Sequence, residues 1–229
     1  MTEAEWAVCT APHRMLRFLR DSENISRRQE RLFAVAVCRR LWPLLNDQRS
    51  RQAIELAERA ADAYVPEREL DQVSAAAEEA WEELVELAET GRHADLRAAE
   101  AAAHAASYAS SPSLTLAVLE EVLEATEEAA FFNSREGEDA AQAAVLRDIV
   151  GNPFRRSPLV DPSWLGWNGD IIPALARTIS DVHAFDRLSI LADALEDAGC
   201  TDRVILDHCR GPGPHVRGCW VVDLILGKP

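Results

Sequence analysis

Hydrophobic positions recur at helical spacing along most of the chain. After Ser26, for example, Phe33, Val37, Leu41 and Leu44 follow one another at steps of four and three residues. This spacing matches the 3.6-residue period of an amphipathic helix. The best run of strand-forming residues, 221–226, is short and contains an aspartate. The pattern predicts an all-α protein of about ten helices, a multi-helix antiparallel bundle with a small C-terminal helical module.

Polar and breaking residues mark the expected ends of these helices. Thr2-x-x-Glu5 is a capping box, Thr10 and Ser111 are further expected caps, and Pro43 should kink or end the helix that starts at Ser26. The expected helices are 2–9, 10–20, 26–43, 46–64, 66–91, 94–109, 111–132, 138–150, 171–181, 184–197, 201–210 and 216–226.

The stretch 151–170 interrupts this pattern. It has three prolines, three glycines and two tryptophans, and no helical period. A connection this long is usually functional or disordered. We therefore expect a helical bundle with an acidic middle at 1–150. A loop-linked C-terminal helical module at 151–229 should dock on it through Trp164 and Trp167.

Charge is distributed unevenly along the chain. The formal net charge is −15, and residues 60–150 alone hold 21 acidic and 5 basic residues. Such a surface repels phosphate backbones, which argues against nonspecific nucleic-acid binding. The basic face from Arg27 to Arg40 is expected to pair inside the fold with the acidic helix faces at 78–89 and 120–128.

The chain shows no sign of membrane insertion or export. No segment has the roughly 20 apolar residues that span a bilayer, and the N-terminus lacks the features of a signal peptide. The five cysteines are odd in number and irregularly spaced. We therefore expect reduced thiols and a cytoplasmic protein.

Residues 199–227 concentrate the uncommon side chains. Cys200, His208, Cys209, His215 and Cys219 are all able to bind zinc. Their spacing fits no known zinc pattern, and free cysteines are among the most buried residues. His208, Cys209 and Cys219 are therefore only weak metal candidates. The expectation is core packing, with no metal and no cofactor.

A Gly-Pro-Gly-Pro turn between Arg210 and Arg217 is the candidate binding site. Arg210, His215 and Arg217 flank it, and it leads toward a helix start, where unpaired N–H groups favour an anion. The alternative is a rigid turn whose arginines pair with nearby acids. The sequence leaves both interpretations open.

Asp223 lies in the otherwise apolar run before the C-terminus, and it is counted with the candidate binding residues. A buried carboxylate needs a donor. Arg210, Arg217 and His208 are the nearby donors. We expect one of them to pair with Asp223 and to fix the turn against the last helix.

No common catalytic signature is present, including Gly-x-Ser-x-Gly, His-Glu-x-x-His, Cys-x-x-Cys and Gly-x-Gly-x-x-Gly. The leading hypothesis is a non-enzymatic helical interaction or scaffold protein with a protein partner and no catalytic residues. The alternative is an anion-binding or small-molecule-binding protein, with or without enzymatic activity, that uses the Arg210–Arg217 turn.

Several segments resemble an uncharacterised bacterial family with many paralogous copies. They are the start MTEAEW, the 31–42 helix, GNPFR at 151–155 and the C-terminal HCRGPGPHVRGCWVVDLILGK. The resemblance covers both ends of the chain. It implies no assigned activity and adds no catalytic residue.

Overall fold

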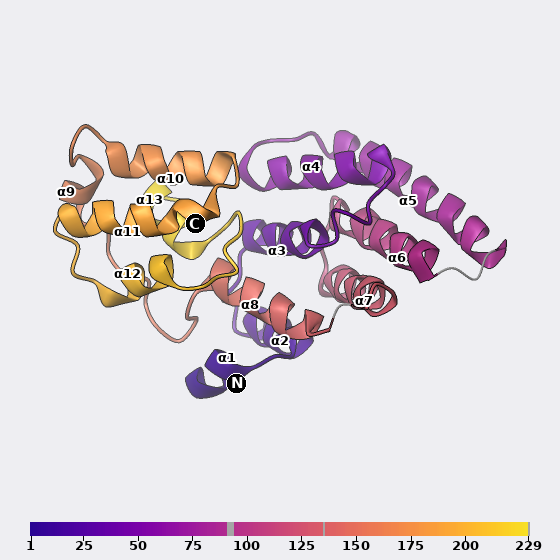
Figure 1. Cartoon of the computed structure of the whole chain (residues 1–229), viewed down its shortest axis with the longest axis horizontal. Helices are drawn as coiled ribbons and strands as arrows, with labels where there is room; N and C mark the ends of the chain where they lie inside the picture. The colour runs from indigo at the N-terminus through magenta and orange to yellow at the C-terminus, as the bar shows by residue number, and fades with distance from the viewer. Residues whose placement is uncertain (91–93, 135, 229) are drawn as a thin grey trace.

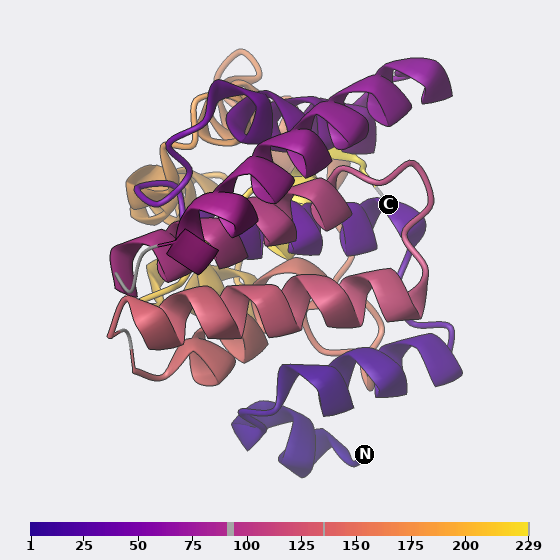
Figure 2. The same cartoon turned by 90° about the vertical axis from the view of Figure 1, so that its right-hand side faces the viewer.

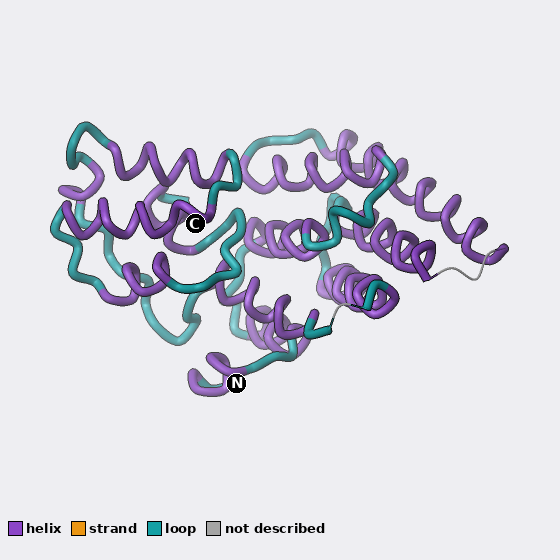
Figure 3. The backbone as a smooth tube through the Cα atoms, in the orientation of Figure 1, coloured by secondary structure: helices purple, strands orange, loops and turns teal. Residues whose placement is uncertain are grey.

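The computed structural model describes residues 1–90, 94–134 and 136–228, and all regular structure in these ranges is helical (Figure 3). They form thirteen α-helices and one 3₁₀ helix, with no strand among them. The all-α prediction is therefore confirmed. None of these helices is both long and apolar enough to cross a membrane.

The first three helices begin largely as the sequence predicts. They are α1 (Glu3–Val8), α2 (Pro12–Asp21) and α3 (Arg27–Arg39). Thr2 and Ser26 form capping boxes at α1 and α3. The predicted Thr10 cap is wrong, because Ala11 precedes α2 and caps it without a side-chain bond.

Five longer helices complete the larger part of the fold. They are α4 (Gln48–Asp62), α5 (Glu67–Thr90), α6 (Ala94–Ala109), α7 (Leu116–Phe132) and α8 (Glu138–Val150). The alanine-rich α6 packs between α5 and α7 (Figure 2). Thr115, rather than the predicted Ser111, caps α7 by accepting a bond from the Val118 N–H. The predicted C′ residue Gly91 lies outside the described residues.

The C-terminal helices gather at the left of Figure 1, with α4–α7 toward the right. They are α9 (Pro162–Leu165), α10 (Ile171–Asp181), the 3₁₀ helix η1 (Phe185–Arg187), α11 (Leu188–Asp197), α12 (Arg203–Arg210) and α13 (Trp220–Leu226). The last helix begins at Trp220, later than predicted, because Gly218 before it has a φ of 95° that no right-handed helix contains.

Two separate hydrophobic clusters form the core of the described ranges. One uses buried residues between Trp6 and Ile149, and the other uses residues between Ile172 and Ile225. Trp164 and Trp167 pack against the second cluster, so they serve the C-terminal helices themselves. Within 151–170, Phe154 instead reaches the N-terminal helices. Its ring stacks on that of Phe18, with 5.2 Å between the ring centroids. The expected Trp164/Trp167 contact is thus wrong, while the division at residue 150 stays a prediction.

Buried ion pairs cross between the two clusters. Arg28 of α3 holds Asp223 of α13 with two hydrogen bonds, of 2.6 and 3.1 Å. It also donates to Asp62 at the end of α4. The expected partners Arg210, Arg217 and His208 are therefore wrong. Asp223 is buried as predicted, and its partner lies 195 residues earlier in the chain.

Candidate metal centre

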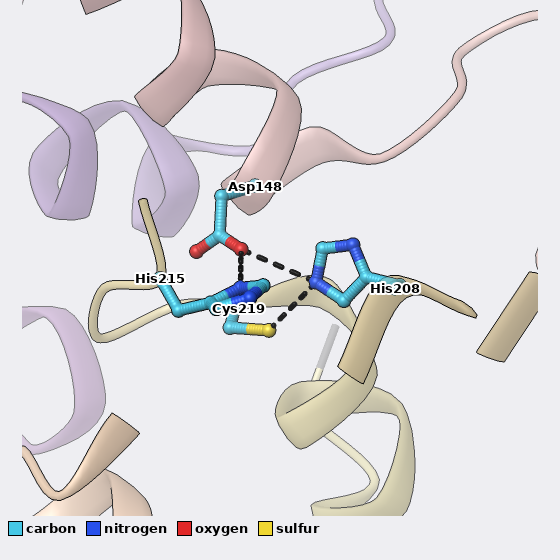
Figure 4. Close-up of side chains that lie close together, drawn as sticks. All are labelled: Asp148, His208, His215 and Cys219. Carbon is cyan, nitrogen blue, oxygen red and sulfur yellow. Dashed lines mark hydrogen bonds and ion pairs between the residues drawn. The ribbon is translucent and has the colours of Figure 1, made fainter. Parts of the chain in front are cut away.

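Four side chains able to bind a metal ion converge where α8 meets the C-terminal helices. They are Asp148, His208, His215 and Cys219, and their ligand atoms all lie within 4.8 Å of one another (Figure 4). Asp148 comes from α8 and His208 from α12. His215 lies in the turn after α12, and Cys219 directly precedes α13.

The local fold explains why these groups meet. Asp148 lies on the inward side of α8, next to Ile149 of the first cluster. The chain then returns through Gly218, which approaches α3 so closely that an added Cβ would lie 2.9 Å from Leu32 Cδ1. This close approach places Cys219, whose side chain is fully buried, beside the end of α8.

Asp148 is the centre of the hydrogen-bond network. One oxygen, Oδ1, lies 2.7 Å from His215 Nδ1 and 3.2 Å from His208 Nε2. The other, Oδ2, accepts the Val216 N–H at 2.9 Å. Burial opposes ionisation of Asp148, yet the bonds from both histidines hold its pKa below the ordinary value. Asp148 is therefore an ionised carboxylate with only 2% of its side chain exposed.

His215 is oriented for a ligand role through Nδ1. Its Nε2 lies 3.4 Å from the Gly211 carbonyl oxygen, which can only accept, so Nε2 carries a proton. A second proton or a metal cation must then lie between Nδ1 and Asp148. Burial lowers the pKa of His215, but the Asp148 carboxylate outweighs it and raises that pKa. Ligating histidines commonly donate their other N–H to a backbone carbonyl, as His215 does.

His208 is held by an indole. The Trp220 Nε1–H donates to His208 Nδ1 at 3.0 Å, which places the proton of a neutral ring on Nε2. Nε2 faces Asp148 and lies 3.2 Å from Cys219 Sγ. A metal bound at Nε2 would displace that proton to Nδ1. The Trp220 hydrogen bond must then open.

Cys219 is unsuited to act as a nucleophile. Burial first, and then the charge of Asp148, raise its pKa well above that of a free thiol, against the effect of the Val221 and Val222 N–H groups. A buried, protonated thiol is inert, whereas a metal cation would convert it to a thiolate ligand. Cys209 stands apart from the four ligand groups, since it packs in the second cluster and burial raises its pKa to about 12.

The three cations expected to bind an anion at the turn do not converge. Arg210 bonds to Asp193 and Glu196 on α11, both at 2.7 Å. Arg217 bonds to Asp62 at 2.8 Å. His215 bonds to Asp148. Each positive group of the turn thus has its own acidic partner.

Asp148 was not among the metal ligands predicted from the sequence, since the candidates there were His208, Cys209 and Cys219. Sixty residues separate it from His208, so no local spacing connects them. The usable signal was an acid directly beside Ile149, on the face of 138–150 that also carries Val145. In an amphipathic helix, an acid on the inward face requires a partner in the interior.

A cavity of about 220 Å³ reaches this group of side chains. Asp148, His208 and the 211–215 turn contribute to its lining. It gives a small ion a route to the ligand atoms.

No protein-family model, curated protein or solved structure matches this chain. The resemblance to an uncharacterised bacterial family therefore stays a hypothesis.

Proposed function

We propose that this chain is a non-enzymatic helical interaction protein in which one zinc ion joins the C-terminal helices to the bundle. Asp148, His208, His215 and Cys219 are the proposed ligands. The observation that supports this most is their convergence within 4.8 Å from segments that pack in different hydrophobic clusters.

The spacing of the four groups suits a tetrahedral ion. Zinc bonds of about 2.0–2.3 Å put tetrahedral nitrogen and sulfur ligands roughly 3.3–3.6 Å apart. His208 Nε2 lies 3.2 Å from both Cys219 Sγ and Asp148 Oδ1. The 2.7 Å between Asp148 and His215 has to widen by roughly 0.6 Å, because a hydrogen bond joins them now.

The ligand types favour zinc over the alkaline-earth ions. A thiolate and two imidazoles suit zinc and its neighbours among the transition metals, whereas calcium and magnesium require oxygen ligands. Four protein ligands leave a tetrahedral ion no open position for a substrate. Closed coordination is typical of structural sites, and this supports the non-enzymatic function class.

Other proteins are the proposed partners, bound through the helix surfaces that the ion holds in place. The net charge of −15 argues against nucleic acid as the partner. Anion binding at the Arg210–Arg217 turn has less support, because its three cations already have acidic partners. Cross-linking in the source cells tests the partner class, and recovery of this chain alone would count against it.

Metal analysis of the purified protein tests the zinc proposal. One equivalent of zinc is expected in the parent, and loss of it in His215→Ala and Cys219→Ser. Cys209→Ser is the matched control, since Cys209 is a buried cysteine outside the four ligands. A parent without zinc after incubation with the ion, or equal loss in the control, would overturn the proposal.

A further inference from the structure

A cavity of about 720 Å³ lies away from the four proposed ligands. It opens between the start of α3, the end of α4 and the 112–115 loop before α7. Four arginines line it: Arg20, Arg27, Arg28 and Arg31. Its volume is in the range of small-molecule sites.

Arg31 is a half-buried cation without an acidic partner in the described part of the chain. Its two terminal nitrogens donate to the carbonyl oxygens of Ser111 and Pro112, at 3.0 and 2.9 Å. No carboxylate lies within ion-pair distance of it in the described ranges. These bonds use two of the five guanidinium N–H groups and hold the side chain in place. Burial alone lowers its pKa, consistent with an uncompensated charge.

The neighbouring arginines divide into two kinds. Arg20 lies 2.6 Å from Glu30, and Arg28 is held by Asp62 and Asp223. Arg27 is exposed and has no direct ion pair in the described ranges, although its charge opposes the rise that burial causes in the pKa of Glu30. The cavity thus contains two cations, Arg27 and Arg31, whose charge no bonded acid balances.

Glu30, which pairs with Arg20, also lines the cavity, together with two further acids and an apolar wall. Glu23 and Glu67 are exposed, so water screens their charge. Ile25, Ala61 and Leu114 provide apolar surface. A phosphate group has only a few times the volume of a water molecule, which occupies about 30 Å³. Alone, it would therefore fill only a small part of this cavity. The remainder suits an organic body.

We propose that this cavity binds a small organic phosphate, with the phosphate on Arg27 and Arg31 and the organic part against the apolar wall. Planar guanidinium groups bind phosphate oxygens in pairs of hydrogen bonds. The immobilised Arg31 reduces the entropy lost on binding. The site is independent of the proposed metal centre, because the two share no residue.

Calorimetric titration of the purified protein tests this inference. The probes are glucose 6-phosphate and ADP, with glucose and adenosine as their unphosphorylated counterparts and citrate as a carboxylate. At least one phosphate probe should bind at millimolar concentration or below, while its unphosphorylated counterpart should not. Binding of citrate alone, of the counterparts equally, or of no probe would overturn the proposal.

Two variants assign the binding to these residues. Arg27→Ala should weaken binding of the phosphate probe roughly tenfold, the loss expected for one charge-assisted hydrogen bond. The zinc content and the melting temperature should not change. Arg177→Ala is the matched control, an exposed arginine on α10 outside the cavity. Arg31→Lys keeps the positive charge but lacks the planar set of guanidinium N–H groups, so it should also weaken binding of the phosphate probe. Equal affinity in the parent and Arg27→Ala would contradict the assignment, even if zinc binding is confirmed.

Discussion

Removal of Asp223 should destabilise the fold strongly, because it breaks the buried pair that connects α3 to α13. Arg28 and Asp223 share two hydrogen bonds, and their side chains are only 14% and 9% exposed. Breaking such a pair costs about 3–5 kcal/mol, since one charge stays buried without its partner. In Asp223→Ala, Arg28 loses this partner but retains its ion pair with Asp62, at 2.8 Å. We therefore expect a loss of about 3 kcal/mol in the free energy of unfolding.

The intact pair should contribute less to the free energy of unfolding than is lost when one partner is removed. Burial raises the pKa of Asp223 even though Arg28 opposes it, so the pair does not fully offset the desolvation of the carboxylate. The double variant Arg28→Met with Asp223→Leu removes both charges and refills the volume. It should lose less stability than Asp223→Ala alone. Asp223→Asn should also be milder, because the amide still accepts a hydrogen bond.

Urea unfolding in excess zinc measures these differences, with thermal melting as a second observable. A loss of 3 kcal/mol corresponds to a fall of roughly 6–12 °C in a protein of this size. Arg210→Ala is the control, because its partners Asp193 and Glu196 are exposed and such pairs contribute about 0–1 kcal/mol. A melting temperature of Asp223→Ala within a degree of the parent would refute this argument.

Three further predictions follow from the same contacts. Zinc should change the tryptophan fluorescence, because coordination requires the Trp220 indole to release its imidazole partner; a change that persists in Trp220→Phe would contradict this. Burial raises the pKa of Asp62, but its cationic hydrogen-bond partners together lower it from 3.8 to about 2. Its stabilising effect, about 2 kcal/mol, is therefore present above pH 3.8 and lost as the pH falls toward about 2. Urea unfolding across this pH range should show a smaller loss of stability in Asp62→Asn than in the parent. An equal loss of stability would refute the assignment. Gly218→Ala should cost about 1–3 kcal/mol, because φ is 95° and the new Cβ meets Leu32 at 2.9 Å. Gly137→Ala, with positive φ but open space, should cost less in the same assay.

Local signals in the sequence were sufficient to predict most helices. The Thr2 and Ser26 caps and the hydrophobic period of α3 each act within a few residues, so the sequence shows them directly. The helix caps predicted at Thr10 and Ser111 were wrong for a related reason. Prolines such as Pro12 and Pro112 mark turns as well as helix starts, and the helices begin at Pro12 and Leu116.

Partners across the chain could not be predicted in the same way. Asp223 was correctly expected to be buried and paired, because its own helix is apolar. Its partner Arg28 and the fourth proposed ligand Asp148 are brought near by tertiary packing alone. Proximity in sequence favoured Arg210, which instead pairs with α11.

The cobalt absorption spectrum tests the central claim most directly, because cobalt replaces zinc in tetrahedral sites and absorbs visible light. Adding one equivalent of Co²⁺ to the zinc-free protein should give the visible bands of a tetrahedral ion together with a sulfur-to-cobalt charge-transfer band. The charge-transfer band should vanish in Cys219→Ser and persist in Cys209→Ser, and zinc should bleach the spectrum. A spectrum of octahedral, water-bound cobalt, or a charge-transfer band that survives in Cys219→Ser, would contradict the proposed centre.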